Sequence, residues 1–273
     1  MAQRFAHLRF GRKIMKSLKV WLLYTNYSFQ QVLTNRVLMV IFMTGKAIRI
    51  LMFLLFLTFI FQGAADIAGF DRRQIIFFYL VFNFIDTSAQ LFFREVYRFR
   101  PLVISGNLDF VLLKPVNPLI RVLLGGADVM DLIMLGLIGI ATVWFGAGFI
   151  SSSLSHWLLF ALLVLNGIIL SAAFHITVLG IGIITVSIDH LIMIYRDLTA
   201  LMRIPVDLYI EPIRSLLTFV IPLGIMFTFP AKALMNFLSW QMILVSFVMS
   251  VGSLSAALIF WRYSLRHYQS ASS

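Results

Sequence analysis

The chain has 273 residues, of which 61% are hydrophobic and only 12% are charged, and its 22 Lys and Arg against 11 Asp and Glu give a net charge of +11. A soluble domain carries about 25% charged residues, so this composition leaves too little polar surface for a water-facing globule and makes the bilayer the solvent. The chain has no cysteine, which excludes a disulfide framework and thiolate metal sites.

The positive charge is concentrated in three segments of the chain. Residues 1–36 hold seven Lys and Arg and no acid, and 94–121 and 262–267 are also basic. Because Lys and Arg collect on the cytoplasmic side of membrane proteins, we assign all three segments, and both termini, to the cytoplasm. No aromatic-basic recognition module accompanies these segments, so the sequence does not indicate a nucleic-acid partner.

The first expected element is an amphipathic helix over residues 13–34, within a cytoplasmic or interfacial segment 1–36. Apolar residues including Trp21 and Phe29 fall on one arc, and Lys16 and Lys19 fall opposite. Such a helix would lie in the membrane interface with its lysines towards anionic lipid. An ordinary helix packed on the rest of the protein is the alternative.

The hydropathy of the chain predicts six membrane crossings, because a helical span needs about 20 apolar residues. Taken in order, five of the crossings fall at 38–62, 74–93, 120–148, 157–186 and 240–261. The expected fold class is therefore an all-α integral membrane protein, with residues 1–273 forming a single membrane domain.

The remaining crossing, fifth in chain order, has two possible positions. Hydropathy alone makes 187–214 a cytoplasmic connection and 216–235 the span, although the latter contains Pro222 and Pro230. Alternatively, 187–203 is a short polar crossing and 205–235 dips back into the outer leaflet. Backbone that is not helical is tolerated at that depth only where protein or water covers it.

Ionisable residues within the spans indicate pairing or function, since they are costly in a bilayer. Lys46 and Arg49 lie at a depth similar to that of Asp86 in the next span, which favours an ion pair. Snorkelling of the two basic residues and direct substrate contact are the alternatives. Asp128 and Asp131 lie one turn apart and could pair with a neighbouring helix or form a relay.

Sequence motifs for catalysis are missing. There is no G-x-x-x-x-G-K-[ST], H-E-x-x-H, G-x-S-x-G or G-x-G-x-x-G in the chain. We therefore expect no enzyme activity and no ATP site in this chain.

Two blocks of the sequence resemble the permeases of type-2 ABC transporters. The first, "SGNLDFVLLKPVNPL", is similar to the pattern S-G-x-L-D-x-x-L-x-x-P-x-x-P-L, and the second spans 203–235. The second block departs from the family pattern at Ile204, where an aromatic is frequent, and near Met235, where a glycine is missing. The matching residues are Ser105, Gly106, Leu108, Asp109, Leu112, Pro115, Pro118 and Leu119 in the first block and Pro205, Asp207, Tyr209, Arg214, Leu217, Pro222 and Pro230 in the second.

The resemblance implies a permease subunit of an exporter in a bacterial or archaeal cytoplasmic membrane. It would dimerise with a copy of itself or a related chain and bind two cytoplasmic ABC ATPase subunits, which would hold ATP and Mg. Its coupling helix would lie in the loop 94–118, with Lys114 beside the motif residues, and 205–235 would form outer re-entrant helices. The substrate would be a drug, lipid or other amphiphile.

Two other classes of protein remain open at this point. One is a secondary transporter driven by protons or ions through Asp86, Asp128, Asp131 and His175. The other is an accessory membrane protein without transport activity. An adjacent reading frame with a P-loop would favour the ABC permease.

Overall fold

The computed structural model describes residues 19–30, 34, 36–63, 65–149, 153–185 and 188–268. In these ranges the chain is helical throughout, apart from turns and one isolated bridge between Ile67 and Phe70. The predicted all-α fold is therefore confirmed for the described part of the chain. The expected elements within 1–18 and at 31–33 lie outside it.

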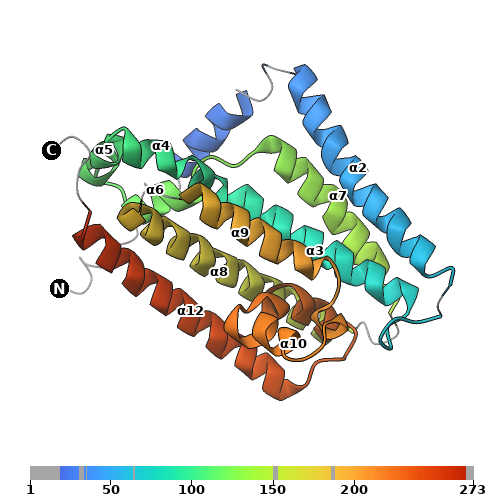
Figure 1. The fold of residues 1–273 in the computed structure, drawn as a ribbon. Coiled ribbons are helices and arrows are strands. Elements are labelled where there is room, and N and C mark those ends of the chain that lie inside the picture. Colours follow the sequence, from blue (N-terminus) through green and yellow to red (C-terminus); the bar gives the residue numbers. More distant parts are fainter. Residues whose placement is uncertain are drawn as a thin grey trace, which may run out of the picture.

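Five helices in the described residues are long and apolar enough to cross a membrane, and a sixth candidate is a bent pair. They pack side by side as an elongated bundle (Figure 1). The chain is thus a multi-pass membrane protein. The five are α2 (Arg36–Ile60), α3 (Arg72–Phe93), α7 (Val129–Gly146), α8 (Leu154–Thr185) and α12 (Trp240–Arg266).

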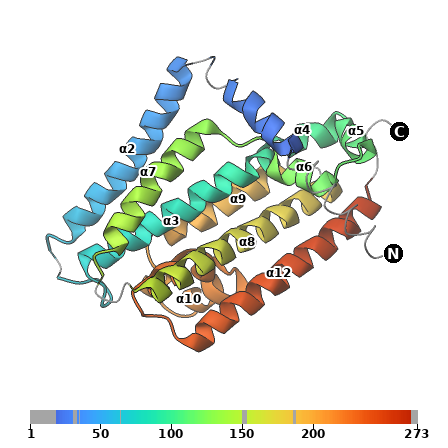
Figure 2. The ribbon, with the colours of Figure 1, turned by 180° about the vertical axis from the view of Figure 1, so that it is seen from behind.

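Helix α3 is the centre of the bundle. Its start is fixed by a capping box, in which Asp71 accepts from the Gln74 amide at 2.8 Å and donates its own amide to the Gln74 side chain at 2.9 Å. Phe77 and Ile85 of this helix are fully buried. Figures 1 and 2 show α3 and α8 in the middle, with α2 on one flank and α12 on the other.

The third predicted span, 120–148, is divided in the structure. Helix α6 (Pro118–Leu124) ends at Gly125, whose φ of +23° breaks the helix, and α7 begins only at Val129. At Gly126, a Cβ atom would lie 2.7 Å from the backbone oxygen of Tyr24. The two glycines therefore allow the N-terminal segment to pack against the backbone here, which a continuous helix would prevent.

Residues 19–30 form the helix that makes this contact. Trp21 donates its indole N–H to the Leu124 carbonyl at 3.0 Å, and the Ala127 amide donates to the Thr25 hydroxyl at 3.2 Å. Arg121 lies over the ring of Tyr24 at 4.2 Å from its centroid. The segment is thus fixed to the bundle by its own contacts, and a position in the lipid interface stays a prediction.

The segment between α8 and α12 does not contain a straight span over 216–235. Residues Ile213–Val220 and Gly224–Leu234 form two helical pieces bent by 80° at a break that contains Pro222. Before them, α9 (Ile188–Ala200) and the 3-10 turn η2 (Leu201–Arg203) run alongside α8 and α3 (Figures 1 and 2). The segment that hydropathy alone makes the fifth span, 216–235, is therefore a bent pair of helical pieces, which fits a broken span or a re-entrant segment.

The bent pair forms a compact structure at the end of the bundle opposite α5 (Figure 1). Its pieces are α10 (Ile213–Ser215), the π-helical turns η4 (Leu216–Val220) and η5 (Gly224–Thr228), and α11 (Phe229–Leu234). Gly167 of α8 packs against η5, and a Cβ atom there would lie 2.6 Å from the Met226 carbonyl oxygen. Close helix packing thus covers the irregular backbone with protein.

Candidate functional site

A short helical knob, residues 99–117, projects at the end of the bundle that carries α5. Helix α3 continues through the 3-10 turn η1 (Arg94–Arg98) into α4 (Phe99–Ile104), and a sharp turn leads to α5 (Asn107–Leu113). Gly106 has a φ of +71°, which glycine adopts without steric cost. Ser105 stabilises the turn by donating its hydroxyl to the Pro101 carbonyl at 2.7 Å. The Ser-Gly pair of the motif therefore sets the angle between the two helices.

The other end of the knob is closed by the two prolines of the motif. The exposed Lys114 has an extended backbone and ends α5 just before Pro115. Asn117 then caps α6 by accepting from the Leu119 amide at 3.0 Å, and Pro118 occupies the first helical position. The motif thus holds α5 as a separate short helix.

The apolar residues of the knob divide into an anchor and an exposed face. Leu108 is 0% exposed and packs in a cluster with Val96 and Phe99, so it fixes the knob to the bundle. Although Leu108 belongs to the motif, it therefore supplies no exposed surface for contact with a partner. Phe110 is 64% exposed and Leu113 is 81% exposed, and these two are the outward apolar side chains of α5. Leu112 is half-buried.

The charged residues around the knob are mostly paired within the chain. Glu95 accepts from Arg121 at 2.9 Å and lies 3.7 Å from Arg98, while Arg100 donates to Asp189 of α9 at 2.8 Å. Arg98 and Arg100, two basic residues of the segment 94–121, thus both have an acid partner within the chain. The Arg100 pair joins the knob to α9, and the Arg121 pair joins η1, just before the knob, to α6, just after it.

The segment just after α12 also touches the knob. Tyr268, just after α12, packs against the cluster that contains Leu108. Burial raises the pKa of the Tyr268 phenol, and the neighbouring Asp109 carboxylate raises it further. Asp109 therefore faces the end of α12 as well as lying in the first turn of α5.

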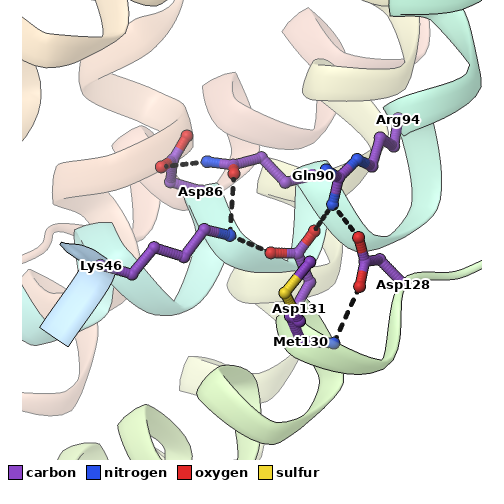
Figure 3. A network of polar contacts seen from close by, with 7 residues as sticks. All are labelled: Lys46, Asp86, Gln90, Arg94, Asp128, Met130 and Asp131. Atoms are coloured by element: carbon purple, nitrogen blue, oxygen red, sulfur yellow. Dashed lines mark hydrogen bonds and ion pairs between the residues drawn. The ribbon is translucent and has the colours of Figure 1, made fainter. Parts of the chain in front are cut away.

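A second group of polar residues forms an ion-pair network inside the bundle (Figure 3). Asp131 of α7 pairs with Lys46 of α2 and lies 3.2 Å from Arg94. Arg94 also pairs with Asp128, which caps α7 by accepting from the Met130 amide at 2.8 Å. Two cations thus face two carboxylates, and the network links α2, η1 and α7.

The expected ion pair between Asp86 and Lys46 or Arg49 does not form. Lys46 pairs with Asp131 instead. Gln90 lies between Lys46 and Asp86, and its side chain donates to Asp86 at 2.8 Å and accepts from Lys46 at 3.5 Å (Figure 3). Sequence reasoning missed Gln90 and placed Arg94 in a cytoplasmic loop. Arg94 directly follows α3, which packs along α7, and this packing places Arg94 beside Asp128 and Asp131.

A polar cavity of about 240 Å³ lies beside Asp86, between α2, α3 and α9. It is lined by Arg49, Tyr79, Phe82, Asn83, Asp86, Gln90, Tyr97, Met193, Arg196, Asp197, Thr199, Ala200 and Arg203. Gln90 is common to the cavity and the ion-pair network, so the two are physically continuous.

His175 is not joined to these carboxylates by any hydrogen bond in the described residues. Its Nδ1 donates to the Ser171 carbonyl at 2.8 Å, and its ring packs against Phe93 and Tyr195. This is the arrangement of a buried histidine satisfied within its own helix.

The residues of the second motif block lie together in the bent segment. Asp207 accepts from Lys232 at 2.8 Å, and Arg214 donates to Glu211 at 2.9 Å. Tyr209 donates its hydroxyl to the Leu201 carbonyl at 2.7 Å. Pro205 precedes Val206, whose amide donates to Thr228 at 3.1 Å, and Pro222 and Pro230 lie at the break and in the first turn of α11. These contacts hold the segment together. The role of Lys232 as the partner of Asp207 was not predicted from the sequence.

Comparison with protein families identifies the chain. A family model described as an ABC-2 family transporter protein matches residues 47–272. The chain belongs to the ABC-2 family of transporter proteins. The matched region covers all five span-length helices in part or whole, together with the knob, the polar cavity and the bent segment. No curated protein and no solved structure matches this ABC-2 transporter chain.

Membership places the chain among the transmembrane permeases of ABC transporters. In this family the ATPase is a separate subunit, which implies that the ABC-2 permease works with ABC ATPase partners. The candidate functional sites of the permease are therefore the exposed knob, which is accessible to a partner, and the polar cavity within the bundle.

Proposed function

We propose that this chain is the permease subunit of an ABC exporter, and that separate cytoplasmic ATPase subunits drive it through the knob. The knob carries a rigid turn, a buried anchor at Leu108 and two outward apolar side chains, Phe110 and Leu113. A helix that is fixed to the bundle and presents apolar surface outwards can receive force from a partner and pass it on. In this proposal both termini and the knob face the cytoplasm.

Ion pairs of the knob and of the elements on either side of it supply a route for that motion. Arg100 joins α4 to α9, and Arg121 joins α6 to Glu95 of η1. Movement of the knob would therefore shift α9 and the end of α3, two of the elements that line the polar cavity. Rigid-body movement of helices around a central site is a common way to alternate access. The proposed permease acts as a dimer, of two copies or of this chain and a related one.

The proposal is tested by co-purification of the ATPase that accompanies the wild-type chain. Phe110→Asp with Leu113→Asp should reduce the bound ATPase at least tenfold, because full burial of one such side chain contributes about 1.5–3 kcal/mol. Ile210→Asp is the matched control, since Ile210 is 77% exposed but lies in the segment at the opposite end of the bundle. Asp109→Lys and Pro115→Leu should also weaken binding. ATPase retained at wild-type levels by the double variant would contradict the proposal.

A transport assay separates this proposal from the secondary transporter. The permease in proteoliposomes should move substrate only with its ATPase and ATP present. Proton-driven uptake by the purified chain alone would instead indicate a secondary transporter that uses the intramembrane carboxylates.

A further inference from the structure

The polar cavity carries more positive than negative charge. Its lining includes three arginines, Arg49, Arg196 and Arg203, and two carboxylates, Asp86 and Asp197. The formal net charge of the lining is therefore +1. The adjacent network adds nothing to this sum, because Lys46 and Arg94 are balanced by Asp128 and Asp131. The excess charge therefore belongs to the cavity itself.

In the described part of the chain, no carboxylate lies within 4 Å of the three cavity arginines, although Asp86 and Asp197 share the lining with them. None of them forms an ion pair there, and Arg203 lies 5.9 Å from the centroid of the Phe53 ring. By contrast, Lys46 and Arg94, which lie close by, both have carboxylate partners. The cavity thus concentrates guanidinium groups whose hydrogen-bond donors are open to a ligand.

The position of Arg49 in a span-length helix makes its charge costly unless another group or a ligand meets it. Arg49 lies 13 residues after the start of α2 at Arg36, or about 20 Å along the helix at 1.5 Å per residue, which is well within a span. Arginines at such depth pair with other groups or mark a substrate pathway. A guanidinium binds a carboxylate or phosphate through two parallel hydrogen bonds, so an anion fits these donors best.

We propose that this cavity binds the anionic headgroup of an amphiphile, a carboxylate, phosphate or sulfate on an apolar tail. This inference names the substrate class of the exporter and rests on the proposed function. The volume of about 240 Å³ is below the range of about 300–1,000 Å³ typical of sites that enclose a whole drug-sized ligand. The cavity therefore holds the headgroup, and the tail extends past the exposed Met193 along α9.

The test uses the purified chain alone, in nanodiscs of zwitterionic phosphatidylcholine, with radiolabelled dodecyl phosphate as the probe. Wild-type protein should bind the probe saturably, and Arg49→Gln with Arg196→Gln should weaken binding at least tenfold. Arg196→Lys keeps the positive charge but loses the guanidinium that can donate two parallel hydrogen bonds. The affinity of this variant for the probe should therefore lie between those of the wild-type protein and the double variant. Arg262→Gln is the control, since Arg262 is exposed at the end of α12, outside the cavity.

Competitors identify the ligand chemistry. Unlabelled dodecanoate should displace the probe, whereas dodecyltrimethylammonium and inorganic phosphate at the same concentration should not. Displacement by the ammonium amphiphile would show that the anion is not what binds, and equal displacement by inorganic phosphate would show that the tail is not required. Either result overturns the proposal.

Two further outcomes would also overturn it. One is unchanged probe binding by the double variant, provided that it elutes as wild type and unfolds at the same temperature. The other is a wild-type chain that is dimeric and a double variant that is monomeric. That result would show that the arginines pair with acids on a second copy of the chain. Because no ATPase is present, each result is independent of the co-purification that tests the proposed function.

Discussion

Asp131 offers the sharpest test of how the helices are held together. Its side chain is 1% exposed and meets both Lys46 and Arg94. Replacement of Asp131 by Asn removes the charge and keeps the shape, which leaves two cations facing a neutral amide. Breaking one partner of a fully buried ion pair costs about 3–5 kcal/mol.

The expected loss for this variant is smaller than that range. Lys46 is 26% exposed and Arg94 is 39% exposed, and Arg94 keeps Asp128 as a partner. We therefore expect Asp131→Asn to lower the free energy of unfolding by about 2–3 kcal/mol. At about 2–4 °C per kcal/mol for a chain of this size, the melting temperature should fall by about 4–12 °C.

The assay is thermal unfolding in mild detergent, followed by tryptophan fluorescence, with a double-mutant cycle. Lys46→Ala and Asp131→Ala should couple by more than about 1 kcal/mol, because the two side chains touch. The cycle of Arg49→Ala with Asp131→Ala is the control and should be additive within about 0.5 kcal/mol. Asp86→Asn should cost less than about 1 kcal/mol, since the amide oxygen can still accept from Gln90. Equal losses for Asp86→Asn and Asp131→Asn, or an additive Lys46 cycle, would refute the assigned network.

Two further predictions concern the end of the bundle opposite the knob. Gly167→Val should destabilise the protein by about 1–3 kcal/mol in the same assay, because the new side chain meets the Met226 carbonyl, whereas Gly136→Val, where a Cβ atom meets nothing within 4 Å, should be near neutral. Equal effects of the two would contradict the close packing of α8 on η5. The second prediction concerns Glu211, whose carboxylate accepts from the hydroxyl and the amide of Ser215. The hydrogen bond from the hydroxyl is the main reason why the pKa of Glu211 lies below its ordinary value of 4.5. These hydrogen bonds are therefore intact above pH 4.5 and are lost only as the pH falls through the lower pKa of the folded state. The protection of the Ser215 amide against hydrogen exchange, taken relative to its intrinsic rate at each pH, should fall only below pH 4.5, and a midpoint at or above that value would contradict the assignment.

The long apolar elements were predictable from the sequence, and the interruption after α6 was not. Spans predicted at 38–62 and 74–93 begin within two residues of α2 and α3 in the structure. The third span begins later than hydropathy indicates, because Gly125 and Gly126 break an otherwise continuous apolar run. Hydropathy measures transfer to lipid and carries no information on where a second helix needs close access to the backbone.

The side chains of the candidate sites were only partly predictable. The depth of Lys46 showed that it needed a partner, but depth alone cannot tell whether α3 or α7 supplies the acid. The structure shows that Asp131 does. Likewise, the motif pattern marks Leu108 without indicating that it points inwards, because periodicity in a helix as short as α5 does not fix which side is buried.

The cavity was the least predictable feature. Two of its arginines, Arg196 and Arg203, come from the segment whose hydropathy is ambiguous. They share a cavity with Arg49 and Asp86 only because α9 packs on α8 and η2 packs on α3. No spacing within the sequence relates residue 49 to residue 196. Such a site depends on which helices are neighbours, and hydropathy does not determine that.

The most direct test of the account is the side of the membrane on which the knob lies. Because the chain has no cysteine, Leu113→Cys creates a unique thiol on a side chain that is 81% exposed. If the knob faces the cytoplasm, an impermeant maleimide leaves this thiol unlabelled in intact cells and labels it after the membrane is permeabilised. Labelling in intact cells would place the knob outside, beyond the reach of any cytoplasmic ATPase, and would contradict the account.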